Sequence, residues 1–148
     1  MKNTLETRLG IFVALTVLAA AVILERVGSL DAVYAPDVHF RDPFNDVRGI
    51  EELRRIFGHM YETLEEPRFA ITETILEGDR AVLVWDFDFR IKAWKPRVTQ
   101  RIHGLSVVRF GADGRVTHHR DYWDAAGELY AKLPLVGPLV RYLARRMA

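Results

Sequence analysis

The clearest pattern along the chain is a strict alternation of apolar and polar residues in AVLVWDFDFRIK, residues 81–92. A repeat of two residues is typical of a strand that has one face buried and the other in water. The expected inner face carries Leu83, Trp85, Phe87, Phe89 and Ile91, and the outer face carries Asp86, Asp88, Arg90 and Lys92. We therefore predict a half-buried strand that presents large aromatic side chains to a core.

A helical repeat precedes this strand. In IEELRRIFGHMYETLEE, residues 50–66, apolar positions recur every three or four residues, which predicts an amphipathic helix. Pro67 is expected to end that helix, because proline lacks the N–H that a helix interior needs. Alternation then resumes over residues 69–75 and runs to a turn at Gly78 and Asp79, which predicts another strand.

The remaining patterns complete an α+β order. Residues 98–110 and 116–123 read as two further strands joined by the turn GADGR, and residues 37–43 read as a short one. Helical character is expected over residues 5–34 and again from about Asp124. The three long strands from the aromatic strand onward follow one another closely, so we expect them to pair as an antiparallel meander.

The N-terminal part contains an uncharged apolar run of 16 residues, LGIFVALTVLAAAVIL, which begins at Leu9 and ends at Leu24. A membrane-spanning helix needs about 20 such residues, so a buried core helix is the favoured interpretation. A short membrane anchor and a signal peptide, with Lys2 and Arg8 as its basic end, remain open. The core helix predicts a cytoplasmic protein, and the alternatives predict a membrane-anchored or exported one.

Composition narrows the class of protein. The chain has 148 residues, of which 49% are hydrophobic and 28% charged, which fits one compact domain with a sizeable core. Its net charge of +1, with bases and acids interleaved, disfavours a nucleic-acid partner. No cysteine is present, which excludes disulfides, thiol catalysis and cysteine metal sites.

The stretch YAPDVHFRDPFNDVRG, residues 34–49, raises a chemical question. Residues two apart in a strand share a face, so Phe40 and Asp42 should point the same way and place a carboxylate beside an aromatic wall. Such burial costs free energy unless the carboxylate has a function or a hydrogen-bond partner. Asp42 is therefore a candidate general base. Alternatively, it accepts backbone N–H bonds within the turn DPFND.

A second candidate lies in THHRDYWD, residues 117–124, where alternation puts His119, Asp121 and Trp123 on one face. A carboxylate beside an imidazole can orient the ring and favour its protonated form, so His119 and Asp121 form a candidate acid–base pair. The alternative is a structural hydrogen-bonded pair. Because His118 faces the opposite side and no third ligand follows, we expect no metal site.

The order of elements and three motifs resemble the nuclear transport factor 2-like superfamily, which includes ketosteroid isomerases, SnoaL-type polyketide cyclases and scytalone dehydratase. The motifs are YAPD at Tyr34, DPF at Asp42 and HRDYWD before the last helix. The resemblance covers roughly residues 9–125 of a single domain, 1–148, and leaves residues 126–148 as a C-terminal helical extension. It implies an α+β fold, in which a curved antiparallel sheet wraps around N-terminal helices as a cone open to a small apolar ligand. It also implies a homodimer through the outer sheet face.

The resemblance also suggests roles for residues. Asp42 falls at the position of the base in ketosteroid isomerases, but Leu18, Phe57 and Ser106 fall where those enzymes have two tyrosines and a proton-donating aspartate. Steroid isomerisation by that mechanism is therefore not expected. The implied chemistry is a cofactor-independent isomerisation, dehydration or cyclisation, with Asp42 as base and His119 with Asp121 as acid or orienting pair. The expected pocket residues are Leu18, Phe40, Phe44, Phe57, Tyr61, Trp85, Phe87, Ser106 and Trp123.

Two other functions remain open from the sequence. One is a non-catalytic binding domain whose carboxylates are structural, and the other is a membrane-tethered protein. The C-terminal sequence LYAKLPLVGPLVRYLARRMA predicts a short basic amphipathic helix over about residues 139–147. Such a helix usually packs on its own domain or on a second subunit, and less often lies on an anionic membrane. Membrane association is thus open but not favoured.

Overall fold

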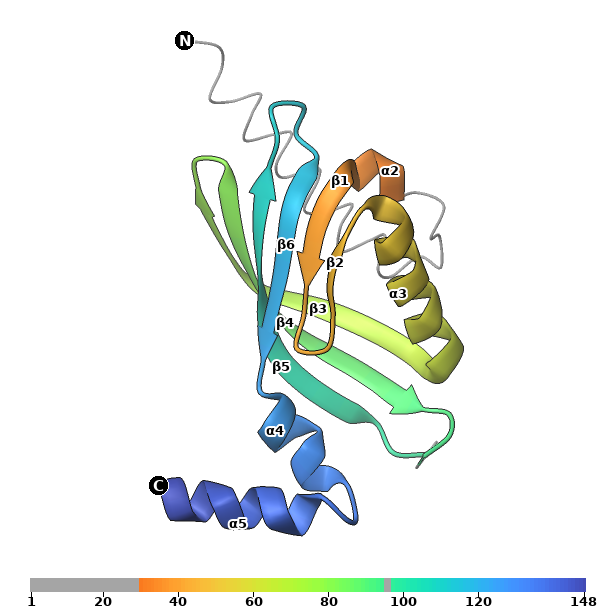
Figure 1. Cartoon of the computed structure of the whole chain (residues 1–148), viewed down its shortest axis with the longest axis vertical. Helices are drawn as coiled ribbons and strands as arrows, with labels where there is room; N and C mark the ends of the chain where they lie inside the picture. Colours follow the sequence, from red (N-terminus) through yellow and green to blue (C-terminus); the bar gives the residue numbers. More distant parts are fainter. Residues whose placement is uncertain (1–29, 95–96) are drawn as a thin grey trace.

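The computed structural model describes residues 30–94 and 97–148. These residues form a single sheet, one long helix against it and a C-terminal helical extension (Figure 1). The elements are α2 (Leu30–Val33), β1 (Tyr34–Arg41), β2 (Asp46–Arg48), α3 (Ile50–Thr63), β3 (Leu64–Glu77), β4 (Arg80–Ile91), β5 (Gln100–Phe110), β6 (Val116–Trp123), α4 (Ala125–Glu128), the 3₁₀ turn η2 (Tyr130–Lys132) and α5 (Gly137–Met147).

The six strands lie in the order β2-β1-β6-β5-β4-β3. Strands β3 to β6 form an antiparallel meander, as predicted, and β1 joins the edge of β6 in parallel. The sheet curls, and α3 lies across its concave face (Figure 1). The predicted α+β cone is therefore confirmed, with one parallel pair in an otherwise antiparallel sheet.

The core forms where the concave face meets α3. Alternation along β4 is as predicted: Leu83, Trp85, Phe87 and Phe89 are buried. From the other side α3 contributes Leu53, which is fully buried. Along the second half of β4 the buried residues alternate with Asp86, Asp88 and Arg90 on the convex face, so this part of the sheet has one apolar and one polar side.

The junction between α3 and β3 differs from the prediction that Pro67 ends the helix. The helix ends at Thr63, and Pro67 lies inside β3, where the register shifts between Glu65 and Arg68. Proline is tolerated there because β3 is an edge strand and a bulge needs no ladder hydrogen bond at that residue. The Lys92 ammonium donates to the last carbonyls of α3, at Tyr61 and Glu62, and so stabilises the helix end.

Two other boundaries move by a few residues. The strand expected over residues 37–43 is β1, which begins at Tyr34 and ends before the Asp42–Pro43 turn, and the strand expected from residue 98 begins at Gln100. The apolar run over residues 9–24 lies outside the described residues. Among the described residues, no helix is both long and apolar enough to cross a bilayer.

Gly104 gives room to an aromatic side chain of the core. Gly104 on β5 is paired with Trp85 on one side and Trp123 on the other, and an added Cβ would collide with the Trp85 indole. A glycine is therefore required there for steric reasons, although glycine weakens a strand interior.

We predict that Gly104→Ala lowers the free energy of unfolding by about 1–3 kcal/mol, because the Trp85 ring must shift within a packed core. Gly58→Ala is the matched control: it lies within α3 with open space around it, and alanine there should raise stability by about 0.4–1 kcal/mol. Urea denaturation of the two variants and the wild-type protein measures both effects. Equal effects of the two substitutions would contradict this account of Gly104.

Candidate functional site

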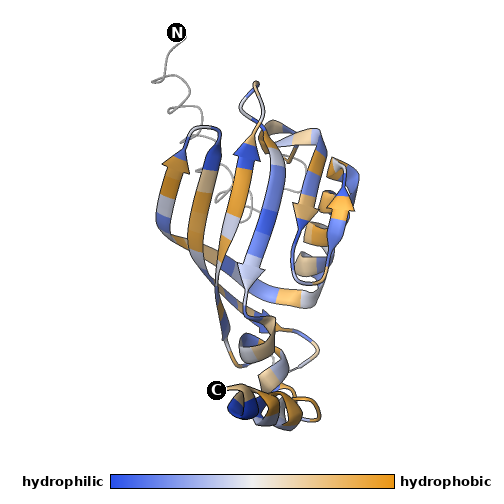
Figure 2. Cartoon of the chain, turned by 60° about the vertical axis from the view of Figure 1, so that its left-hand side comes forward, coloured by the Kyte–Doolittle hydropathy of each residue, from blue (hydrophilic) through white to orange (hydrophobic). Residues whose placement is uncertain are grey.

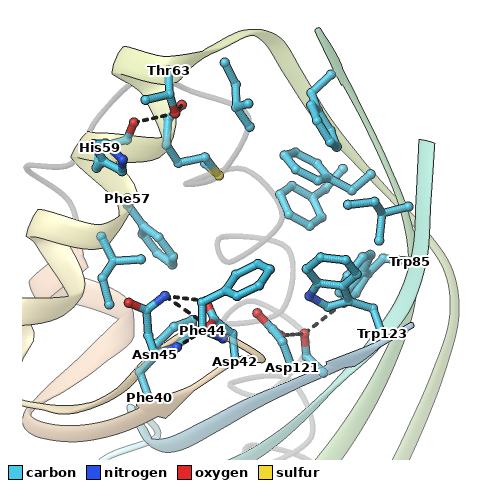
Figure 3. A pocket seen from close by; sticks show the side chains of 18 of the residues that line it. Phe40, Asp42, Phe44, Asn45, Phe57, His59, Thr63, Trp85, Asp121 and Trp123 are labelled. Atoms are coloured by element: carbon cyan, nitrogen blue, oxygen red, sulfur yellow. Dashed lines mark hydrogen bonds between the residues drawn. The ribbon is translucent and has the colours of Figure 1, made fainter. Parts of the chain in front are cut away.

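A cavity of about 500 Å³ lies between α3 and the concave face of the sheet (Figure 3). This volume is within the range of small-molecule binding sites, roughly 300–1,000 Å³. The predicted pocket residues that line it are Phe40, Phe44, Phe57, Trp85, Phe87, Ser106 and Trp123. Tyr61 is not among the lining residues, because the face of α3 toward the cavity carries Phe57, Met60 and Thr63 instead. Leu18 lies outside the described residues.

The cavity wall is mostly apolar. Aromatic rings from β4 stack along one side: Phe69 of β3 lies parallel to Phe87 with ring centroids 4.0 Å apart, and Phe87 contacts Phe89 at 4.8 Å. The opposite side is the apolar face of α3. A ligand that fills this space must therefore present mainly apolar surface, because polar groups would lose hydrogen bonds to water there.

A chain of hydrogen bonds crosses one wall of the cavity. The Trp85 indole Nε1 donates to Ser106 Oγ over 2.9 Å, and Ser106 Oγ donates to Asp121 Oδ1 over 2.5 Å. His119 Nε2 lies 2.8 Å from the same Oδ1, and His119 Nδ1 lies 2.8 Å from the hydroxyl of Tyr34. Four residues from four strands are thus linked to one carboxylate oxygen, two of them directly and two through a neighbour.

The sheet register produces this convergence. Ser106 on β5 lies directly opposite Asp121 on β6, and Phe40 on β1 lies opposite His119. His119 and Asp121, two residues apart on one strand, share its concave face, as predicted from the alternation. Tyr34, at the start of β1, is brought to His119 by the parallel pairing of β1 with β6, with the two rings stacked at 5.9 Å.

The protons in this chain follow from chemistry. An ionised carboxylate only accepts hydrogen bonds, so His119 donates through Nε2–H to Asp121. In a neutral imidazole the other nitrogen then accepts, and Tyr34 donates its hydroxyl proton to Nδ1. Every donor in the chain is therefore directed, in one or two steps, at Asp121.

The residues of this hydrogen-bond chain are buried or partly buried, and burial keeps the hydroxyl proton on Tyr34. Tyr34 is fully buried, and the side chains of His119 and Asp121 are 8% and 21% exposed. Burial raises the pKa of the Tyr34 hydroxyl well above its usual value of 10.0, and the negative charge of Asp121 raises that pKa further. Tyr34 therefore remains a proton donor to His119 throughout the neutral range and beyond it.

Asp121 keeps one oxygen available. Its carboxylate projects from β6 into the cavity, and within residues 30–94 and 97–148 no group donates a hydrogen bond to Oδ2 (Figure 3). One oxygen is thus held by Ser106 and His119, while the other is directed at whatever occupies the cavity. A carboxylate with a fixed orientation and a free oxygen in a mainly apolar space can act as a general base.

Asp42 is bonded differently. It also lines the cavity, at the turn after β1, but its Oδ1 accepts backbone N–H bonds from Phe44 and Asn45 over 2.7 and 2.6 Å. The Asn45 side-chain amide donates to both of its oxygens. Asp42 therefore makes the bonds expected if its role is structural, because its carboxylate accepts from the backbone of its own turn (Figure 3).

The cavity is bordered on its solvent side by a group of aromatic residues. Phe44, which is 54% exposed, contacts Trp123 with ring centroids 5.5 Å apart and Tyr130 at 6.3 Å. Leu129, from the segment after α4, also lines the cavity. The C-terminal extension therefore contributes to the opening of the site, although the pocket prediction included none of its residues.

The sequence prediction missed other members of the site as well. Tyr34 was part of a family motif, but nothing in the sequence indicated that its hydroxyl meets His119, because parallel pairing of β1 with β6 is a tertiary feature. Asn45 could have been found as a partner of Asp42 within the turn. In the described part of the chain, no three His, Asp or Glu side chains lie close enough together to hold a metal ion.

Comparisons with known proteins agree with this architecture. The model of the SnoaL-like domain family matches residues 18–119. No curated protein matches the chain by sequence. A protein with a ketosteroid isomerase-like fold from Catenulispora acidiphila DSM 44928, solved in complex with trimethylamine, superimposes with a TM-score of 0.71 at 19% identity, covering 78% of this chain and 88% of that one.

Two further solved structures are similar at the level of the fold. An LEH-like epoxide hydrolase from Mycobacterium tuberculosis has a TM-score of 0.69 at 18% identity, covering 91% of this chain and 96% of its own. A protein from Shewanella putrefaciens CN-32, described by its likeness to SnoaL-like polyketide cyclases, has a TM-score of 0.67 at 18% identity, covering 77% and 89%. At these identities the likeness shows the fold alone.

The buried Tyr34 hydroxyl predicts a dependence of stability on pH. Below pH 10 both the folded and the unfolded chain keep this proton; above it the unfolded chain loses the proton first, so stability falls as pH rises toward the higher folded pKa. Tyr34→Phe should remove about 1 kcal/mol of the stability loss between pH 9 and about pH 11. Tyr142→Phe, in an exposed position on α5, is the matched control.

Urea denaturation at the two pH values measures the difference. The account predicts a smaller loss for Tyr34→Phe than for the wild-type protein and for Tyr142→Phe. The same loss in all three proteins would contradict the assignment of Tyr34 as a buried proton donor.

Proposed function

We propose that this chain, which belongs to the SnoaL-like domain family, binds a small apolar molecule in its cavity and transfers a proton on it, with Asp121 as the general base. The reaction class is a cofactor-independent isomerisation, dehydration or cyclisation. The observation that supports it best is Asp121 Oδ2, which ends a polarised hydrogen-bond chain and accepts no hydrogen bond from residues 30–94 and 97–148.

The proposed step needs only this oxygen. Asp121 Oδ2 takes a proton from a carbon or hydroxyl of the bound molecule, the bonding electrons stay on the substrate, and the protonated carboxyl later returns the proton to another atom. Ser106 and His119 hold Oδ1 and so fix the direction in which Oδ2 points. A correctly placed base contributes about 10²–10⁴-fold to such a rate.

This assignment changes the expected division of roles. The family resemblance made Asp42 the base and placed Asp121 beside His119 as acid or orienting group. Three N–H donor groups of its own turn bond to Asp42 and reach both of its oxygens, so this carboxylate is held by the turn. We therefore assign the base to Asp121 and the orienting role to His119, Ser106 and Tyr34.

The fold-level neighbours support a small-molecule cavity in general terms. One was solved with trimethylamine, one is an epoxide hydrolase and one is likened to polyketide cyclases. For the present chain, a small apolar ligand is part of the proposal, and so is a homodimer through the outer sheet face.

A non-catalytic binding protein is the second candidate, and one observation favours it. Within the described residues, the cavity lining contains no Lys, Arg or Tyr side chain that could stabilise a developing negative charge. A base without such donors gives a weaker catalyst, because electrostatic stabilisation is usually the largest contribution. The experiment below separates binding from proton transfer.

The test uses 5-nitrobenzisoxazole, a flat apolar probe that fits an aromatic cavity. A base removes its ring C–H proton, the N–O bond breaks, and the coloured cyanonitrophenolate product is followed by absorbance. We expect kcat/KM of the wild-type protein to exceed that of Asp121→Asn by about tenfold or more. Asp42→Asn should stay within about threefold of the wild type, and Asp79→Asn, in an exposed turn, is the charge-matched control.

Quenching of tryptophan fluorescence measures probe binding separately, because Trp85 and Trp123 both line the cavity. A probe that binds all variants but reacts no faster in the wild type than in Asp121→Asn would refute the catalytic assignment and leave a binding protein. A large loss of rate in Asp42→Asn alone would return the base to Asp42. Absence of binding to the wild type would refute an apolar ligand site.

A further inference from the structure

The C-terminal segment differs in net charge from the rest of the chain. Residues 129–148 contain Lys132, Arg141, Arg145 and Arg146 and no acidic side chain. Because the whole chain has a net charge of +1, the remaining residues carry −3, the difference between +1 and +4. The last helix and the turn before it thus carry a net positive charge, whereas the rest of the chain is net negative.

The same helix exposes an apolar stripe. Leu139, Leu143 and Met147 are spaced by four residues along α5, so they lie on one side of the helix, and they are 57%, 49% and 88% exposed. Val136 and Leu135, just before the helix, extend this surface and are also exposed. Apolar and basic residues both appear along α5 in Figure 2.

The helix is attached firmly but stands apart from the sheet. The buried Gly137 packs against the Ala131 carbonyl, and the Arg141 guanidinium donates to that same carbonyl, which joins α5 to the turn η2. Away from this contact, α5 projects beyond the end of the sheet (Figure 1). Its apolar stripe is therefore presented outward in a fixed orientation.

We propose that α5 docks the protein on the surface of an anionic lipid bilayer. An apolar stripe on one side of a helix with basic residues on its remaining surface is the pattern of helices that lie in the membrane interface, and each basic residue near an anionic leaflet contributes about 1 kcal/mol. With 11 residues, α5 is far too short to span a bilayer, which needs about 20. A second copy of α5 on the same stripe would bring like charges together, whereas anionic headgroups neutralise them.

Docking in this way has a consequence for the cavity. Leu129 lines the cavity and Tyr130 contacts Phe44 at its solvent side, so the segment leading to α5 borders the opening. A bilayer bound to α5 would hold the opening close to a source of apolar molecules. The docking itself is independent of the proposed chemistry at Asp121.

The absence of cysteine allows a probe at one position of the full-length chain. Met147→Cys labelled with the environment-sensitive fluorophore nitrobenzoxadiazole reports on the apolar stripe, and Asp79→Cys with the same label, in an exposed turn on the sheet, is the matched control. Both proteins are mixed with vesicles of phosphatidylcholine alone or with about one third phosphatidylserine.

We expect the label at position 147 to brighten at least about twofold with a blue shift on anionic vesicles only, and the label at position 79 to stay unchanged. Added salt, or the double substitution Arg145→Glu and Arg146→Glu, should abolish the response. The control is the charge-matched double substitution Arg55→Glu and Arg80→Glu, on the body of the domain. It should leave most of the fluorescence response of the label at position 147.

Three outcomes would overturn the proposal. The first is a label at position 147 that does not respond to anionic vesicles. The second is an equal response on neutral vesicles that the arginine substitutions do not change, which would indicate attachment through another part of the chain. The third is a response to rising protein concentration in place of lipid, which would assign the stripe to a second copy of the protein.

Discussion

The pairing of β5 with β6 is the constraint on which the site depends. In the observed register Ser106 lies opposite Asp121, and Gly104 lies opposite Trp123. A shift by one residue would turn Asp121 and His119 to the convex face and bring Arg120 and Tyr122 into the cavity, because side chains alternate along a strand. The register of β4 with β5 places Trp85 opposite Gly104, which leaves room for the Trp85 ring, and the indole N–H of that ring begins the hydrogen-bond chain.

The hydrogen bonds to Asp121 offset the free-energy cost of placing a carboxylate in the cavity. A carboxylate in a mainly apolar space loses much of its hydration, and a free energy cost of several kcal/mol is expected without compensation. Ser106 and His119 supply two donors to one oxygen of Asp121, and Tyr34 completes the bonding of His119. These two bonds keep the carboxylate in place, and no donor in the described part of the chain reaches its second oxygen, which can therefore accept from a ligand. Asp42 represents the opposite solution, a carboxylate whose needs are met entirely within its turn.

Much of the fold could be predicted because local patterns report burial directly. Alternation along residues 81–92 located both faces of β4, and alternation along residues 116–123 put His119 and Asp121 together on the concave face. The SnoaL-like family model bears out the family resemblance. Pro67 was misinterpreted because a proline in an edge strand and a proline after a helix look the same in sequence.

The division of roles between Asp42 and Asp121 could not be predicted in the same way. Both carboxylates follow an aromatic residue by two positions and both line the cavity. They differ only in which donors reach them: a local turn supplies the donors of Asp42, whereas strands distant in sequence supply those of Asp121. Tyr34 shows the same limit, since its contact with His119 joins residues 85 positions apart.

The most direct test of the account is the position of the proton on His119, measured by ¹⁵N NMR of the imidazole ring, with His119→Gln to assign its signals. If every donor in the chain is directed at Asp121, the proton lies on Nε2, and Nδ1 shows the shift of an unprotonated nitrogen that accepts from Tyr34. A proton on Nδ1 would reverse the bond to Tyr34 and leave a lone pair of His119 facing the carboxylate. That result would contradict an ionised Asp121 held ready to act as a base.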